Sequence, residues 1–229
     1  MTEALEGFLQ ALSAGLLIGA IYGLMCVGLG LIFGVMRVIN FAQGDFMMLG
    51  MYAAFYFFTA LGVQATFGNN FGPFVAILLA GPVLAVFGYF VHLTLISRVS
   101  GMRTSSLEGE GHYAQLILTL GIALILQNGG LLVFGSVLAS IRTPLSSSAW
   151  EIGPLLYDVS VFINKARGID AVVSLMTMLL LTLLITRSRI GKSLRAAADN
   201  PTAATYMGID VDRAHRVAFA LGTGVTAIA

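Results

Sequence analysis

The sequence predicts an all-α polytopic membrane protein, and its composition and its apolar runs are the observations that predict it. Apolar residues make up 58% of the 229 residues and charged residues only 10%, whereas soluble domains average about 45–50% apolar and about 25% charged. The mean hydropathy is +0.92. A bilayer core of about 30 Å needs about 20 helical residues. We therefore expect a single transmembrane domain over residues 1–229, with about six transmembrane helices of this length.

The apolar runs give the positions of these helices. Four of them lack Asp, Glu, Lys and Arg, and they cover residues 12–36, 46–63, 73–96 and 113–138. The second is at the short end for a crossing. Residues 171–186 form a shorter run that gains length if Ile169 is included across Asp170. The last run, 217–229, enters a membrane segment without leaving it, so we expect the chain to be truncated at its C-terminus.

The composition also disfavours several other kinds of site. The single Cys26 rules out an intramolecular disulfide and gives no cysteine cluster for zinc or iron–sulfur binding. The three histidines are far apart in sequence, so we predict no metal site. The net charge is +1 and no basic patch is interleaved with aromatic residues, so we expect neither nucleic acid binding nor a cofactor.

The stretch RSRIGKS (187–193) imitates the end of a phosphate-binding P-loop. A P-loop needs a glycine five residues before its second glycine and a β-strand leading in. Thr186 occupies the first of these positions, and an apolar run leads in. No GxSxG, HExxH or CxxC motif occurs either. We therefore do not expect this chain to be an enzyme.

Basic residues are unequally divided between the segments that connect the runs. Nine of the twelve Lys and Arg, Arg103 among them, lie in the set comprising 37–45, 97–112 and 187–216. The other set comprises 1–11, 64–72 and 139–170. By the positive-inside rule the first set is cytoplasmic, and residues 139–170 lie on the outer side of the membrane. This orientation assumes that residues 38–46 are a connection; a re-entrant break there would change the parity upstream.

Glycines recur at a spacing of four in the first run, at Gly15, Gly19 and Gly23 and again at Gly30 and Gly34. On a helix this spacing makes a face of small residues that another helix backbone can approach closely. Glycine is also simply common in membrane helices. The tandem repeat favours helix packing. In the fourth run, Gln127 and Asn128 either hydrogen-bond to another helix, which we favour, or face a hydrated path.

The stretch VINFAQGDF (38–46) places polar residues between the first two runs. In one interpretation it is a tight connection in which Asn40 or Asp45 caps the next helix. In the other it is a glycine-broken, amide-rich bend of the kind that lines transporter pathways. The two roles are compatible. We predict the substrate pathway at Asn40, Phe41, Gln43, Gly44 and Asp45.

The stretch from Gly191 to His215 is the most informative soluble segment. Asn200 followed by Pro201 is typical of a helix start, and Gly208 is a natural stop about two turns later. A short helix with alanine and methionine on its surface favours a partner surface. A solvated linker is the alternative, but it would favour charges over the run Ala196 to Ala198. Asp210 or Asp212 can cap the helix that follows.

Two of these motifs together resemble a known family. They are similar to motifs of the inner-membrane permeases of branched-chain amino acid ABC importers, specifically the first Liv-type permease subunit. The first motif is NFAQGDFMMLGMY (40–52). The second, after further apolar runs, is GKSLRAAADNPTAATYMGIDVDRAHRVAFALGTGVTAIA (191–229). The resemblance covers essentially the whole chain in order and spacing.

This resemblance implies an ATP-driven importer that works by alternating access in the lipid of the bacterial inner membrane. Its partners would be a second permease subunit, two cytoplasmic ATPase subunits and a periplasmic substrate-binding protein, which the segment 139–170 would face. The loop 187–216 would couple to the ATPase. Carried over by position, the coupling residues are Ala196, Ala197, Ala198, Asn200, Pro201, Ala203, Ala204, Met207 and Gly208.

Three alternatives to an amino acid importer stay open. A related branch of the family carries urea and short amides, and it shares the same motifs. A secondary transporter usually shows buried ionisable residues, whereas the four long apolar runs contain no Asp, Glu, Lys or Arg. A passive channel would have no use for an alanine-rich coupling loop.

Overall fold

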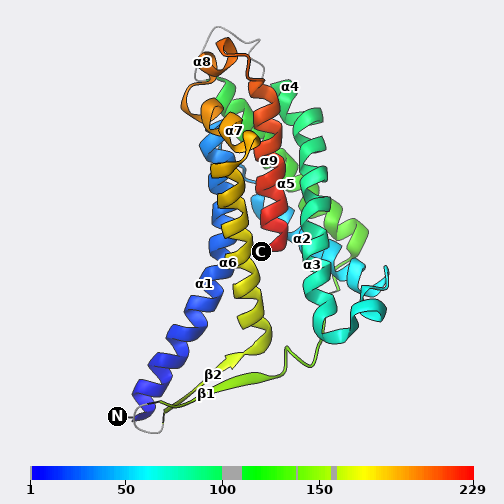
Figure 1. Cartoon of the computed structure of the whole chain (residues 1–229). Coiled ribbons are helices and arrows are strands. Elements are labelled where there is room, and N and C mark those ends of the chain that lie inside the picture. The colour runs from blue at the N-terminus through cyan, green and yellow to red at the C-terminus, as the bar shows by residue number, and fades with distance from the viewer. Residues whose placement is uncertain (1, 100–109, 138, 156–158) are drawn as a thin grey trace.

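A computed structural model describes residues 2–99, 110–137, 139–155 and 159–229 (Figure 1). Most of this part is α-helical, as the sequence predicts. The helices are α1 (Thr2–Met36), α2 (Gln43–Thr59), α3 (Val63–Val91), the π-helix η1 (His92–Ile96), α4 (Ser97–Val99), α5 (Glu110–Phe134), α6 (Lys165–Arg187), α7 (Arg189–Asp199), α8 (Pro201–Tyr206) and α9 (Val211–Ile228). Arg103 and residues 156–158 lie outside the described residues.

Four helical stretches are long and apolar enough to cross a membrane. They are Ala4–Met36, Val63–Val99, Ala114–Phe134 and Lys165–Arg187. The second is interrupted near its start at Gly68, whose backbone angles are not helical. Two of the predicted spans are less regular: α2 has 17 residues, and α9 carries Asp212, Arg213 and Arg216 near its start. The fold is therefore that of a polytopic α-helical membrane protein.

Helix α9 forms the centre of the bundle. It packs against α1, α2 and α3, and Figure 1 shows it (red) between α1 and α3. Its apolar stretch from Gly222 to Ala227 is buried continuously. The rings of Phe46 and Phe219 meet edge to face, with their centroids 5.6 Å apart. Because α9 is surrounded by three helices, it needs small residues along its length.

The two ends of the bundle are built differently. One end carries α7, α8 and the start of α9; the other carries the start of α1 and an antiparallel hairpin of β1 (Ala149–Leu155) and β2 (Val159–Asn164) (Figure 1). We call these the α8 end and the hairpin end. The hairpin departs from the predicted all-α fold. It follows a stretch with Pro144 and three successive serines, and alternation in VSVFIN is typical of a strand.

The hairpin is held to α1 by one side chain. The Nε2 of Gln10 donates to the carbonyl of Phe162 at 2.6 Å, and the Phe162 N–H donates to Oε1 of Gln10 at 2.9 Å. The side-chain amide of Gln10 therefore pairs with both the N–H and the carbonyl of Phe162 in β2. At the end of the same strand, Asn164 caps α6 by accepting from the Arg167 N–H at 3.2 Å.

Candidate functional site

The polar stretch 38–46 is a direct connection between two helices. Helix α1 ends at Met36, Arg37 has a φ of 57°, and α2 begins at Gln43. The Oδ1 of Asn40 accepts from the Ala42 N–H at 3.1 Å, and its Nδ2 donates to Oε1 of Gln43 at 3.1 Å. Asn40 therefore shapes the turn that leads into α2. The interpretation of Asn40 as the cap of this helix is wrong, because the N-cap is Ala42 and no side-chain capping bond is made.

The same connection is tied to α9. The Nε2 of Gln43 donates to the hydroxyl of Thr226 and to the carbonyl of Gly222 at 3.4 Å. Asn40 and Gln43 are each 3% exposed. Helix α1 reaches the same place, because a Cβ on Gly28 would lie 2.5 Å from Oγ1 of Thr226 and 2.7 Å from the Gly222 carbonyl. We call Gly28, Gln43, Gly222 and Thr226 the three-helix junction.

The remaining residues of the predicted pathway have different environments. Asp45 is buried and lies beside the side chain of Gln127 on α5. It is not a helix cap: the N-cap of α2 is Ala42, which makes no side-chain capping hydrogen bond. Phe41 is 53% exposed, and Gly44 is also exposed. The structure thus separates the five residues into three buried polar groups and two surface positions.

The side chain of Gln127 on α5 lies beside Asp45 of α2. Hydrogen bonding of Gln127 to another helix stays a prediction. Asn128 behaves differently, because its Nδ2 donates to the Leu124 carbonyl of its own helix at 2.7 Å.

Helix α8 begins and ends where the sequence predicts. The Oδ1 of Asn200 accepts from the Ala203 N–H at 2.9 Å, with Pro201 as the first helical residue. Gly208 follows the helix with a φ of 80°, a left-handed conformation that favours glycine. Asp210 then caps α9 by accepting from the Arg213 N–H at 2.9 Å.

The alanines of this region do not form one common outer face. Ala204 is 4% exposed, and Ala197 is fully buried. Both pack in a cluster with residues of α1, α7 and α9, namely Val35, Leu194, Val211, Ala214 and Ala218. The interpretation of Ala197 and Ala204 as outward docking residues is therefore corrected: they join α8 and α7 to the bundle.

The outer surface of α8 is formed by its last residues. Tyr206 is 85% exposed and Met207 82% exposed, and Asn200, Ala203 and Gly208 are exposed beside them. Ala196, Ala198 and Pro201 are half-buried. An exposed tyrosine and methionine on a short, rigidly capped helix make a surface suited to contact with another protein.

The P-loop-like stretch forms the turn from α6 into α7. The Ser188 hydroxyl accepts from the Gly191 N–H at 2.9 Å and caps α7. A Cβ on Gly191 would lie 2.0 Å from the Ile185 carbonyl oxygen, so the backbone of α7 approaches that of α6 too closely for any side chain. The glycine therefore serves a tight helix-to-helix turn.

The glycine stripe of α1 mostly faces open space. A Cβ added at Gly15, Gly19, Gly30 or Gly34 would meet nothing within 4 Å, and one at Gly23 would meet only the Met178 side chain at 3.9 Å. No described helix of this chain approaches the stripe closely. The close approach on α1 occurs instead at Gly28, which the spacing of four does not select. Packing of the stripe against a helix of another subunit stays a prediction.

Comparison with known proteins adds a family to this geometry. The family described as "Branched-chain amino acid transport system / permease component" matches residues 11–229. The chain is similar to the high-affinity branched-chain amino acid transport system permease protein LivH of Escherichia coli (strain K12), with 29% identity over all of this chain and 71% of that protein. It is 30% identical to BraD, with the same description, of Pseudomonas aeruginosa, over 97% of this chain and 69% of that protein. The comparison with solved structures gave no match.

Proposed function

Because the chain belongs to the permease family of branched-chain amino acid transport systems, we propose that it is the membrane subunit of an ATP-driven importer of aliphatic amino acids. It is a multi-pass protein of the inner membrane. The observation that carries the proposal is the family match over residues 11–229, which includes both the three-helix junction and α8. The chain itself would carry out no catalysis; ATP would be hydrolysed by separate subunits.

The substrate class rests on the relatives. LivH and BraD are both described as branched-chain amino acid permeases, in organisms as different as Escherichia coli and Pseudomonas aeruginosa. A protein of Methanocaldococcus jannaschii, 28% identical over 90% of this chain, is described as a probable permease of the same kind. These names favour aliphatic amino acids over urea or short amides.

The coupling to ATP would pass through α8. Its exposed Tyr206 and Met207 would contact an ATPase subunit, while its buried Ala204 packs against α9 and α1. The Arg37 guanidinium also donates to the Ala198 carbonyl at 3.2 Å, which ties α7 to the end of α1. A push on α8 would therefore move α1 and α9 together as a rigid body, the kind of motion that alternating access requires.

The remaining assignments follow from this arrangement. The α8 end would be cytoplasmic, with residues 187–216 as the coupling loop, and the hairpin end with residues 139–170 would face the substrate-binding protein. Helices α2 and α9 would complete about six spans with the four longest helical stretches. The open glycine stripe of α1 would meet the second permease subunit. Asn40, Gln43 and Asp45 would act by holding the bend beside the pathway.

The proposal is tested by uptake into proteoliposomes. The protein is reconstituted with its second permease, both ATPases and its binding protein, and entry of labelled leucine and labelled urea is followed with ATP inside the vesicles. Leucine uptake that stops when ATP is replaced by a non-hydrolysable analogue is the expected result. Urea uptake in place of leucine would overturn the substrate class, and leucine entry without ATP would overturn the coupling.

A further inference from the structure

A groove at the α8 end lies between α7 and α9. Its volume is about 430 Å³. Its walls combine apolar residues with two arginines, and they include Arg189, Ile190, Ser193, Leu194, Arg213 and Val217. Asp210 lines the groove as well.

The two arginines of the groove differ from their basic neighbours. Arg37 and Arg195 donate to the carbonyls of Ala198 and Thr186, and Arg216 pairs with Asp210 at 3.7 Å. The guanidinium groups of Arg189 and Arg213 have no hydrogen-bond or ion-pair partner among residues 2–99, 110–137, 139–155 and 159–229. Two unpaired cations thus border the same cavity.

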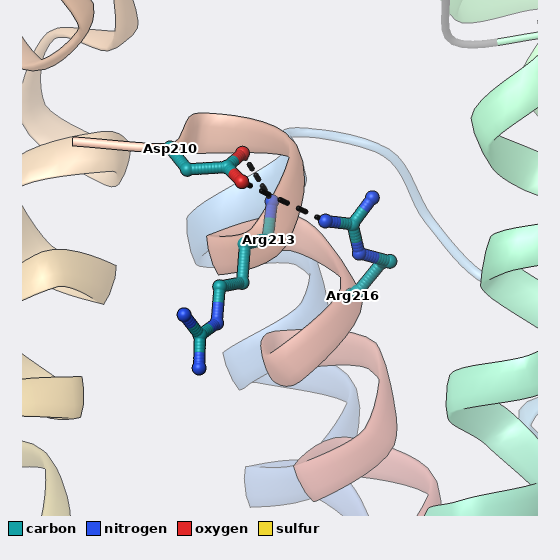
Figure 2. A network of polar contacts seen from close by, with 3 residues as sticks. All are labelled: Asp210, Arg213 and Arg216. Carbon is teal, nitrogen blue, oxygen red and sulfur yellow. Dashed lines mark hydrogen bonds and ion pairs between the residues drawn. The ribbon is translucent and has the colours of Figure 1, made fainter. Parts of the chain in front are cut away.

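Asp210 does not neutralise Arg213. In Figure 2 the Asp210 carboxylate contacts the backbone nitrogen of Arg213 and the guanidinium of Arg216, while the guanidinium of Arg213 points away from it along α9. Among the residues that the structure describes, Asp210 is the acidic residue that lines the groove, and it is already occupied by a helix cap and an ion pair. A ligand that enters the groove would meet uncompensated positive charge.

The positions of the two arginines along the chain indicate how deep the groove lies in the membrane. Arg189 follows directly on the membrane-length helix α6, which ends at Arg187. Arg213 precedes the apolar part of α9, which starts at Val217. Ile190, which lines the groove with the two arginines, is 51% exposed. An exposed isoleucine beside unpaired arginines at the end of a membrane helix is typical of the boundary between headgroups and acyl chains.

We propose that this groove binds the headgroup of an anionic phospholipid. The phosphate would be held by the guanidinium groups of Arg189 and Arg213, with the Ser193 hydroxyl beside them. The acyl chains would lie against apolar surface, beginning at Ile190 and continuing on exposed residues of α6 such as Leu179, Leu180 and Leu183. Bound there, the lipid would brace α7 against α9, the two elements that flank α8. This inference does not depend on which solute is transported.

Native mass spectrometry of the protein, purified in mild detergent with the subunits that accompany it, tests this site. The probes are phosphatidylglycerol and phosphatidylcholine with identical acyl chains, and inorganic phosphate as competitor. We expect one tightly bound phosphatidylglycerol, no comparable phosphatidylcholine and weakening by salt. Replacing both arginines (Arg189→Gln with Arg213→Gln) should weaken phosphatidylglycerol binding about 25-fold, about fivefold for each arginine.

The control is Lys192→Gln, which removes one positive charge from the same helix at an exposed position outside the groove. It should leave binding within about twofold. The single variants Arg213→Gln and Arg213→Lys keep the test decisive if the double variant does not fold: the first should bind about fivefold more weakly and the second as wild type. Three outcomes would each overturn the proposal. The first is equal binding of the two lipids, and the second is competition by inorganic phosphate alone at equal concentration. The third is a double variant that binds lipid normally but loses the ATPase subunits.

Discussion

The side-chain amide of Gln43, in the first turn of α2, donates a hydrogen bond to the hydroxyl of Thr226 in α9, which lies 183 residues further along the chain. The Thr226 hydroxyl in turn donates to the Gly222 carbonyl at 2.9 Å, and Asn40 bonds to the same glutamine at 3.1 Å. The bend after α1 is thereby attached to the central helix of the bundle. Its polar residues form an internal connection among three helices.

Replacing Gln43 with leucine should destabilise the protein. The variant removes the donor to Thr226 and leaves the buried Asn40 amide without its acceptor, which costs about 1–2 kcal/mol of unfolding free energy. We expect a lower melting temperature in detergent and reduced uptake. Gln64→Leu is the control, because Gln64 is exposed and bonds only to nearby Asn69. Equal melting temperatures for the two variants would contradict the role of the junction.

Gly28 should tolerate no side chain. A methyl group there would meet the Thr226 hydroxyl at 2.5 Å and the Gly222 backbone at 2.7 Å, and such overpacking typically costs about 1–3 kcal/mol. Gly28→Ala should therefore lower the yield of folded protein and its melting temperature. Gly30→Ala is the matched control on the same helix, since a Cβ there meets nothing within 4 Å. Indistinguishable stability of the two alanine variants would show that α1 and α9 are not in close contact.

Gly19→Leu separates folding from assembly. The position is exposed and faces no other described helix of the chain, so the fold should not change. If the stripe meets a helix of the second permease, the larger side chain will block close approach. We expect a normal melting temperature for the isolated protein but less complex in affinity purification through a tagged second permease. An unchanged yield of complex would remove the stripe from the subunit interface.

Glutamate at position 204 and glutamate at position 207 should lower uptake for different reasons. Ala204→Glu places a charge in a buried cluster and should destabilise the protein by at least about 2 kcal/mol. Met207→Glu changes an exposed residue and should alter stability by no more than about 0.5 kcal/mol. If Tyr206 and Met207 contact the ATPase, Met207→Glu will still lower uptake at least tenfold and release the ATPase during purification. Normal uptake by a stable Met207→Glu protein would place the docking surface elsewhere.

Gln10→Leu should loosen the hairpin without unfolding the bundle. The variant loses both hydrogen bonds between α1 and Phe162, and each exposed bond of this kind contributes about 0.5–1.5 kcal/mol. Hydrogen exchange followed by mass spectrometry is expected to accelerate in peptides that contain Phe162, while α9 keeps its protection. Protection at Phe162 that matches the wild type would mean that strand pairing alone orders β2.

Local patterns were sufficient for the elements whose structure depends on neighbouring residues. The apolar runs predicted the long helices, and the pair Asn200 and Pro201 predicted the start of α8, because capping and helix length are local properties. The hairpin was missed, since its strands are short and one is held by Gln10, far away in sequence. Glycine spacing selected a stripe on α1 but passed over Gly28, because spacing reports a face of a helix and says nothing of what lies opposite it.

The sequence by itself determined that this is a helical membrane protein, approximately where its long helices lie, and to which permease family it is similar. Only the tertiary structure decided which residues meet: that Gln43 points to Thr226, that Ala204 is buried while Met207 is exposed, and that Arg189 and Arg213 border one groove. The physical reason is the same in each case. Helix formation depends on residues a few positions apart, whereas packing depends on the relative rotation of helices that are distant in the chain.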